Sequence, residues 1–237
     1  MTNNSLLTRW SEVTILCDMD GPTPSDLEPV TRTQKRAIRT RRKLLQAALV
    51  LFSEKGVDAT TIEEITEAAD LGKGTLYRHF SSKDELMVAL IEDAVDRLVI
   101  RLRGKGERRA NLQQALERLL DAHLTFFREN RSEFILLFQG RLFLKLERDE
   151  DGAIEEPFTR YLEEIGKQIA PFVSQPIDPL KIRRLACAVA GFVSGFLSFA
   201  MINMGAGEIE KSMVPLRAAM ISAARSFLGD SIQQSPL

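Results

Sequence analysis

Two helix-start signals that lie close together constrain the fold of this chain most strongly. In Thr60-x-x-Glu63 and in Ser82-x-x-Glu85, a hydroxyl residue precedes a glutamate at the spacing of a capping box. Asp70-Leu71-Gly72 predicts a tight turn between them. The interval therefore has room for only two short helices, one from Thr60 and one over Lys73–Phe80.

Helical spacing of apolar residues continues through most of the remaining chain. We expect one helix from about Gln34 to Lys55, stopped by Gly56, and another from the second capping box to about Arg103. No stretch alternates like a strand, and no internal repeat is present. We predict an all-α fold of about nine helices, the later ones at about 108–129, 132–146, 156–170, 179–203 and 209–228.

The domain organisation follows from this pattern. Residues 1–33 contain Pro22, Pro24 and Pro29 with weak periodicity, which predicts a flexible N-terminal arm. We expect a first domain over 34–82, with a helix-turn-helix at 61–80. A second domain is expected over 83–230, and a tail over 231–237.

The charge is distributed unevenly along the chain. The net charge is −1, yet residues 31–83 carry 11 Lys or Arg against 6 Asp or Glu. A basic block in a mildly acidic chain indicates a phosphate-binding patch, although a solvated face has the same composition. The stretch Arg32–Lys43, with seven positive charges, fits either a DNA-contacting arm or a solvated flank.

The two short helices have the sequence features of a helix-turn-helix. Its second helix must be slim and polar-tipped to enter the major groove, and Lys73-Gly74-Thr75 meets that need. Leu76 and Phe80 are expected to face inward. Tyr77 and His79 would lie on the other side, within reach of phosphates, and Arg78 could reach a base edge or a phosphate.

The stretch Thr60–Phe80, continued by Ser81-Ser-Lys-Asp-Glu-Leu86, resembles the DNA-binding segment of the TetR family. Ala47-Ala48-x-x-x-Phe52-x-x-x-Gly56 is similar to that family's first helix, so the resemblance covers about 38–98. The rest of the chain resembles the family only in its layout of long helices. The resemblance implies a DNA-binding transcriptional regulator, a homodimer on a pseudo-palindromic double-stranded DNA operator, and a ligand-released repressor.

The resemblance also implies roles for single residues. This chain differs from the family's pattern at two positions. Asp70 stands where the family usually has glycine, and Gly72 stands where the family usually has a serine cap. Asp tolerates a left-handed conformation, so the turn is retained, while Gly72 makes a weaker cap. The DNA-contacting residues expected on this basis are Arg42, Thr60, Thr61, Lys73, Gly74, Thr75, Tyr77, Arg78, His79 and Lys83.

Aromatic residues are concentrated in the second half of the chain, which the resemblance assigns to effector binding. Eleven of the fifteen Phe and Tyr lie between Phe126 and Phe199. As a set they suggest a small apolar or aromatic effector, whereas for each of them alone core packing is the favoured explanation. The candidate pocket residues are His123, Phe126, Phe127, Phe134, Phe138, Gln139, Phe158, Tyr161, Phe192 and Phe196.

The last two helices, about 179–203 and 209–228, are expected to form the dimer interface. Doubled by a two-fold axis they would make a four-helix bundle. Pro215 is expected to kink the last helix or to reset its start. The last helix carries a narrow apolar seam of Ile209, Met213, Leu216, Met220, Ala223 and Phe227.

Two other functions were weighed. Residues 185–202 are uncharged and contain Gly191-x-x-x-Gly195, so a membrane-tethered DNA-binding regulator is an alternative. The Ala, Gly and Ser content favours a buried helix instead. An enzyme is disfavoured because the two histidines lie far apart and the glycine motifs do not match a phosphate loop or nucleophile elbow. The only thiols are Cys17 and Cys187, which form no metal-ligand spacing and fit a reducing cytoplasm. We expect a cytoplasmic protein without a cofactor, a metal site or membrane contact.

Overall fold

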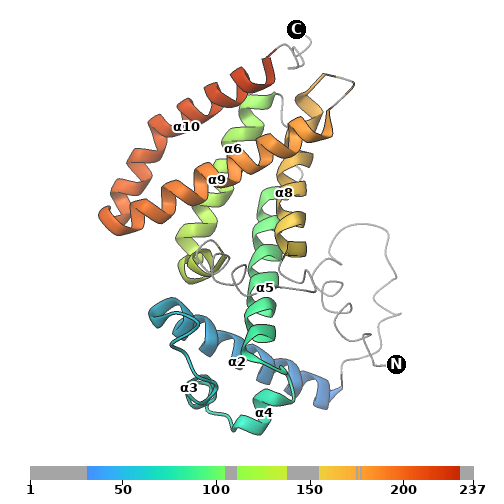
Figure 1. Ribbon diagram of the computed structural model, residues 1–237, viewed down its shortest axis with the longest axis vertical. Helices are drawn as coiled ribbons and strands as arrows, with labels where there is room; N and C mark the ends of the chain where they lie inside the picture. The colour runs from blue at the N-terminus through green and yellow to red at the C-terminus, as the bar shows by residue number, and fades with distance from the viewer. Residues whose placement is uncertain (1–30, 105–110, 138–154, 175, 177, 230–237) are drawn as a thin grey trace. The chain divides into compact units, whose positions relative to one another are not determined.

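The computed structural model describes residues 31–104, 111–137, 155–174, 176 and 178–229. Across these ranges the chain is helical and contains no β-strand, which confirms the all-α prediction. Residues 131–137 are also helical. The bounded α-helices are α2 (Arg32–Lys55), α3 (Ile62–Ala68), α4 (Lys73–Tyr77), α5 (Lys83–Arg103), α6 (Leu112–Glu129), α8 (Glu155–Ile169), α9 (Pro179–Asn203) and α10 (Ala206–Leu228) (Figure 1).

The chain divides into two units between Thr40 and Arg41, inside α2. From Arg41 onward, Leu44, Ala48 and Phe52 recur every four residues on α2 and are buried. They share one apolar core with Ile65 of α3 and Leu76 of α4. This recurring apolar stripe of α2 holds the two short helices α3 and α4 in place.

The start of α3 lies one residue later than predicted. Thr61 is its N-cap: the Thr61 Oγ1 accepts the Glu64 N–H at 3.3 Å, and Glu64 Oε2 accepts the Thr61 N–H at 2.8 Å. Thr60 is instead buried, and its hydroxyl donates to the Gly56 carbonyl at 2.7 Å. The predicted box at Thr60 and Glu63 is therefore wrong, because the Thr60 hydroxyl closes the preceding turn.

The ends of α4 and α5 also differ in detail from the prediction. Helix α4 stops at Tyr77, short of Phe80. Ser82 caps α5 as expected by accepting the Glu85 N–H at 3.1 Å. The Glu85 carboxylate, however, accepts from the N–H and hydroxyl of Ser81 rather than from Ser82. Only half of this second capping box is present.

The long helices form a second layer of packing. Helix α5 packs against α6 and α8, α8 packs against α9, and α9 runs beside α10 (Figure 1). Helix α9 matches its predicted bounds, with Asp178 accepting the Leu180 N–H at 2.9 Å as its N-cap. Helix α10 starts at Ala206 and continues through Pro215, so the proline does not reset its start.

Helix α9 is long and apolar enough to cross a membrane by length and composition. In the fold, 39% of that apolar segment is buried inside the protein. Leu185, Val189, Val193 and Leu197 form its inward face, and the helix packs against α8 and α10. One helix of this kind is weak evidence for a membrane span, since a core helix has the same composition.

Candidate nucleic-acid interface

The turn between α3 and α4 sets the position of the candidate recognition helix. Asp70 adopts the left-handed conformation, with φ of 55°, as the sequence predicted for this site. The Leu71 N–H closes the turn on the Thr66 carbonyl at 2.9 Å. Gly72 is the N-cap of α4 and supplies no side-chain cap hydrogen bond, which confirms the expected weak cap.

Helix α4 has one buried face and one open face. Leu76 is fully buried, and Phe80 just beyond the helix is 2% exposed, as predicted. Tyr77 is 57% exposed, and Lys73, Gly74 and Arg78 are exposed as well. A short helix is thus fixed by its apolar side while its polar N-terminal end stays open to a ligand.

Gly74 is the most informative residue on the open face. A Cβ built at Gly74 meets no atom of the described chain within 4 Å. Packing inside the protein therefore does not require glycine at this position. A close approach of the α4 backbone to an external partner would require it.

Two polar contacts hold the side chains of α4 in place. Lys73 forms an ion pair with Glu63 of α3, and this contact holds the pKa of Glu63 below its usual value. The Arg78 guanidinium donates to the Thr75 hydroxyl at 3.2 Å. Both contacts are exposed, so exchanging either of them for a phosphate or a base edge costs little.

Arg41, which the sequence analysis did not select, belongs to the same region. Its guanidinium lies 5.0 Å from the centroid of the Phe80 ring, a cation–π contact. Burial lowers the pKa of Arg41 despite the opposing charges of Glu92 and Asp93. Burial also lowers the pKa of His79, and the nearby Arg41 and Arg78 lower it further. Only the fold brings Arg41 to Phe80, so no local sequence pattern could have found it.

The remaining predicted DNA contacts differ in accessibility. Arg42 and Thr61 are exposed, whereas the Thr60 hydroxyl lies inside the turn. Lys83 is half-buried, and its ammonium donates to the carbonyls of Val57 at 2.8 Å and Thr60 at 3.1 Å. Thr61 is therefore the threonine whose side chain a phosphate can reach.

The predicted pocket residues that the structure describes lie mainly in the core. His123 and Tyr161 are buried and hydrogen-bonded to each other, with the Tyr161 hydroxyl donating to His123 Nε2 at 2.7 Å. His123 Nδ1–H donates to the Leu119 carbonyl at 2.6 Å, which fixes one neutral tautomer. Burial lowers the pKa of His123 to about 4 and raises that of Tyr161.

The aromatic set is brought together in part. Phe127 and Phe134 meet edge to face, with ring centroids 5.0 Å apart. Phe138 and Gln139 lie outside the described residues. Phe126 and Phe158 are buried in the same core, and Phe192 and Phe196 are half-buried on α9.

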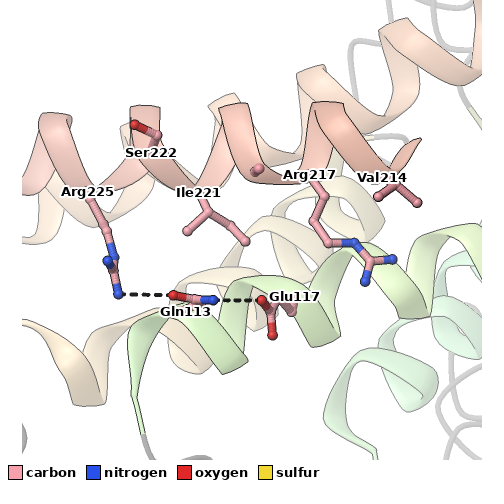
Figure 2. A pocket seen from close by; sticks show the side chains of 8 residues that line it. Gln113, Glu117, Val214, Arg217, Ile221, Ser222 and Arg225 are labelled. Carbon is pink, nitrogen blue, oxygen red and sulfur yellow. Dashed lines mark hydrogen bonds between the residues drawn. The ribbon is translucent and has the colours of Figure 1, made fainter. Parts of the chain in front are cut away.

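A groove lies elsewhere, between α6 and α10. Its volume is about 420 Å³. Figure 2 shows Arg225 donating to Gln113, and Gln113 donating to Glu117, across the floor of the groove. None of the predicted pocket residues lines it. The lining residues are Gln113, Glu117, Val214, Arg217, Ala218, Ile221, Ser222 and Arg225.

Half of the predicted dimer seam on α10 is turned into the chain itself. Ile209, Met213 and Met220 are buried, so they pack within one protomer. Leu216 is half-buried, whereas Ala223 and Phe227 are exposed. The most exposed large apolar side chains of these two helices are Phe199 (74% exposed) and Ile202 (73%) on α9, with Val214 (68%) on α10. Gly191 and Gly195 of α9 also have no close neighbours in the described chain. We define the α9 outer face as Gly191, Gly195, Phe199 and Ile202.

The helix-turn-helix geometry agrees with comparisons to known proteins. Residues 44–90 match the family described as bacterial regulatory proteins, tetR family. The HTH-type transcriptional regulator YvdT of Bacillus subtilis is 30% identical over 129 residues, which cover 54% of this chain and 66% of YvdT. The HTH-type transcriptional repressor KstR2 of Mycobacterium tuberculosis is 28% identical over 128 residues, covering 54% of this chain and 60% of KstR2. The matched region thus spans 60 to 66% of the length of these two relatives.

A solved structure supports the same fold over more of the chain. The tetR-family regulatory protein from Rhodococcus RHA1 superposes with a TM-score of 0.61 at 19% identity, covering 82% of this chain and 98% of that one. The chain therefore carries the helix-turn-helix DNA-binding domain of the tetR family of bacterial regulatory proteins over residues 44–90. The superposition extends the shared all-α fold over 82% of the chain.

Proposed function

We propose that this chain is a cytoplasmic repressor that binds a pseudo-palindromic DNA operator as a homodimer and is released by a small apolar or aromatic effector. The observation that carries the proposal is the open face of α4. Its polar N-terminal end is exposed, while Leu76 and Phe80 anchor the opposite side. A slim helix with a free N-terminal end suits the major groove.

In this proposal α4 enters the major groove N-terminus first. Lys73, Gly74 and Thr75 face the base edges, and Arg78 reaches a base or a phosphate. Tyr77 and His79 contact phosphates on one side of the groove. Arg42, Thr61 and the α3 N-terminus contact phosphates on the other side, with Thr60 holding the turn beneath them.

The α9 outer face supports a homodimer. Phe199 and Ile202 are large apolar side chains that no described part of the chain covers, and their burial against a second copy would be favourable. Gly191 and Gly195 would let two α9 helices approach closely. The two helix-turn-helix units of such a dimer, here called the reading heads, would match a pseudo-palindrome. Its half-sites would lie one helical turn, roughly 34 Å, or a multiple of that distance apart.

The effector part of the proposal rests on the aromatic core around His123. The His123–Tyr161 hydrogen bond is a polar contact in apolar surroundings that a ligand group could replace. An effector lowers DNA affinity if it binds better to a dimer whose two helix-turn-helix units do not match the spacing of the operator half-sites. Repression, rather than activation, is supported by the relative KstR2, which is a transcriptional repressor.

The salt dependence of DNA binding tests the proposal. Arg42→Gln removes one exposed charge from the proposed phosphate surface, and Arg131→Gln removes one from an exposed site on the helix of residues 131–137. Affinity for duplex DNA is measured across a range of salt concentrations. We expect Arg42→Gln to weaken binding and flatten the log–log salt slope by about one, with Arg131→Gln unchanged. Equal slopes for both variants would remove Arg42 from the interface.

A further inference from the structure

Lys83 occupies a position where a cation is electrostatically unfavourable. It is the first residue of α5, and the free N–H groups of a helix make that end partly positive. Ser82 already caps this end, and Asp84 and Glu85 supply the acids that favour it. A lysine here therefore needs a partner outside α5.

That partner is the α2–α3 turn, defined as residues Gly56–Thr60. The Lys83 ammonium donates to the carbonyls of Val57 at 2.8 Å and Thr60 at 3.1 Å. Inside the turn, the Thr60 N–H donates to the Val57 carbonyl at 3.2 Å, and the Thr60 hydroxyl donates to the Gly56 carbonyl. Thr61, the next residue, caps α3. Lys83 is thus tied to the backbone immediately before α3 begins.

The donor capacity of the ammonium decides what else Lys83 can do. A lysine ammonium has three N–H donors and no acceptor. Two of the three are used by Val57 and Thr60, so one is left for a DNA phosphate. We infer that Lys83 is a positioning residue that fixes the α2–α3 turn to the start of α5 and offers only its third donor to DNA. The phosphate part of this inference rests on the proposed function, whereas the positioning part does not.

The distal half of α5 shows where such a link leads. Asp96 of α5 pairs with Arg160 of α8 at 2.9 Å, and Arg103 of α5 pairs with the buried Glu164 of α8 at 3.0 Å. One continuous helix therefore carries ion pairs to α8 at one end and the Lys83 link at the other. Lys83 therefore fixes the first turn of α5 to the start of α3, as the ion pairs fix its last turns to α8.

The test compares Lys83→Met with Lys167→Met, a matched removal of one lysine charge from an exposed site on α8. Native-state hydrogen exchange of the free protein is measured first, since it needs no DNA. We expect the Thr60 amide of Lys83→Met to exchange at least about tenfold faster, as for loss of a charge-assisted hydrogen bond, with the Ile91 amide inside α5 unchanged. We then expect a salt slope for mixed-sequence duplex DNA that is flatter by about one.

Each outcome bears on a separate part of the inference. Unchanged Thr60 exchange in Lys83→Met would overturn the positioning role, and faster exchange with an unchanged salt slope would overturn the phosphate contact. If Lys83→Met does not fold, Lys83→Arg replaces it. Arginine keeps the charge and the donors, so the Thr60 exchange rate and the salt slope should stay near those of the wild type. Faster Thr60 exchange together with a flatter salt slope in Lys83→Arg would overturn the inference. A wild-type chain that binds no duplex contradicts the proposed function alone, because the exchange result stands without DNA.

Discussion

At Gly74, packing within the described chain does not require glycine, whereas the proposed DNA interface does. Because an added methyl group meets no atom of the described chain, we expect Gly74→Ala to leave stability unchanged or to raise it by up to about 1 kcal/mol through helix propensity. We expect at least about a tenfold loss of affinity for selected DNA, since the methyl group would lie between α4 and the groove floor. Urea unfolding and a DNA-binding titration measure the two effects.

Gly207→Ala in the first turn of α10 is the matched control, because that glycine also has no close neighbour in the described chain. It should change stability by a similar small amount and leave DNA affinity unchanged. Full DNA affinity of Gly74→Ala would show that the α4 backbone does not approach DNA closely.

His123 makes stability depend on pH in a defined window. Its folded pKa of about 4 lies below its ordinary value of 6.5 because the ring is buried. As pH falls through 6.5, the unfolded state takes up a proton that the folded state refuses, so stability is lost until about pH 4. The loss amounts to about 3 kcal/mol over this window.

Urea unfolding between pH 7 and 4 checks this expectation. His123→Gln lowers stability at neutral pH but should flatten its pH dependence, whereas His79→Gln, at a partly exposed site, should flatten it much less. Parallel curves for wild type and His123→Gln would assign the acid sensitivity to other groups.

The sequence could identify the types of residue in the helix-turn-helix but not the residue at which each of its helices starts. The left-handed Asp70 and the uncapped Gly72 followed from the family resemblance together with local backbone preferences. The start of α3 did not, because Thr60 and Thr61 are both followed by a glutamate three residues later. The choice depends on the hydrogen bond from Thr60 to the Gly56 carbonyl, a contact set by the folded turn.

At the scale of elements, the α9 outer face makes the homodimer testable. Phe199→Glu places a charge in the proposed interface and should convert the dimer to a monomer. Ile100→Glu alters an exposed apolar residue of α5, 45% exposed, and should leave the dimer intact. Sedimentation over a concentration range measures both. A dimer that persists in Phe199→Glu would place the interface elsewhere.

Helix positions were predictable from periodicity, whereas the partner of each apolar face was not. Helix α9 has its predicted bounds because Asp178 and Pro179 mark its start plainly. Of the seam on α10, Ile209, Met213 and Met220 are buried within one chain, whereas Ala223 and Phe227 are exposed. Apolar spacing cannot distinguish an intramolecular partner from a second copy, because the hydrophobic effect is the same for both.

At the scale of the whole molecule, α5 is the element that connects the two proposed activities. Its first residue holds the α2–α3 turn, and its last turns are tied by ion pairs to α8, where Tyr161 and Glu164 lie. An effector that displaces α8 therefore has a continuous helical path to the reading head. In this account, regulation is a change in the spacing of two heads rather than the unfolding of either.

Selection of bound duplexes from a random-sequence pool tests sequence-specific DNA binding by a two-fold dimer most directly. We expect enrichment of one motif with two inverted half-sites, spaced by about one helical turn or a multiple of it, and loss of that enrichment in Gly74→Ala. Recovery of duplexes without a common motif, or the same enrichment in Gly74→Ala, would contradict this expectation.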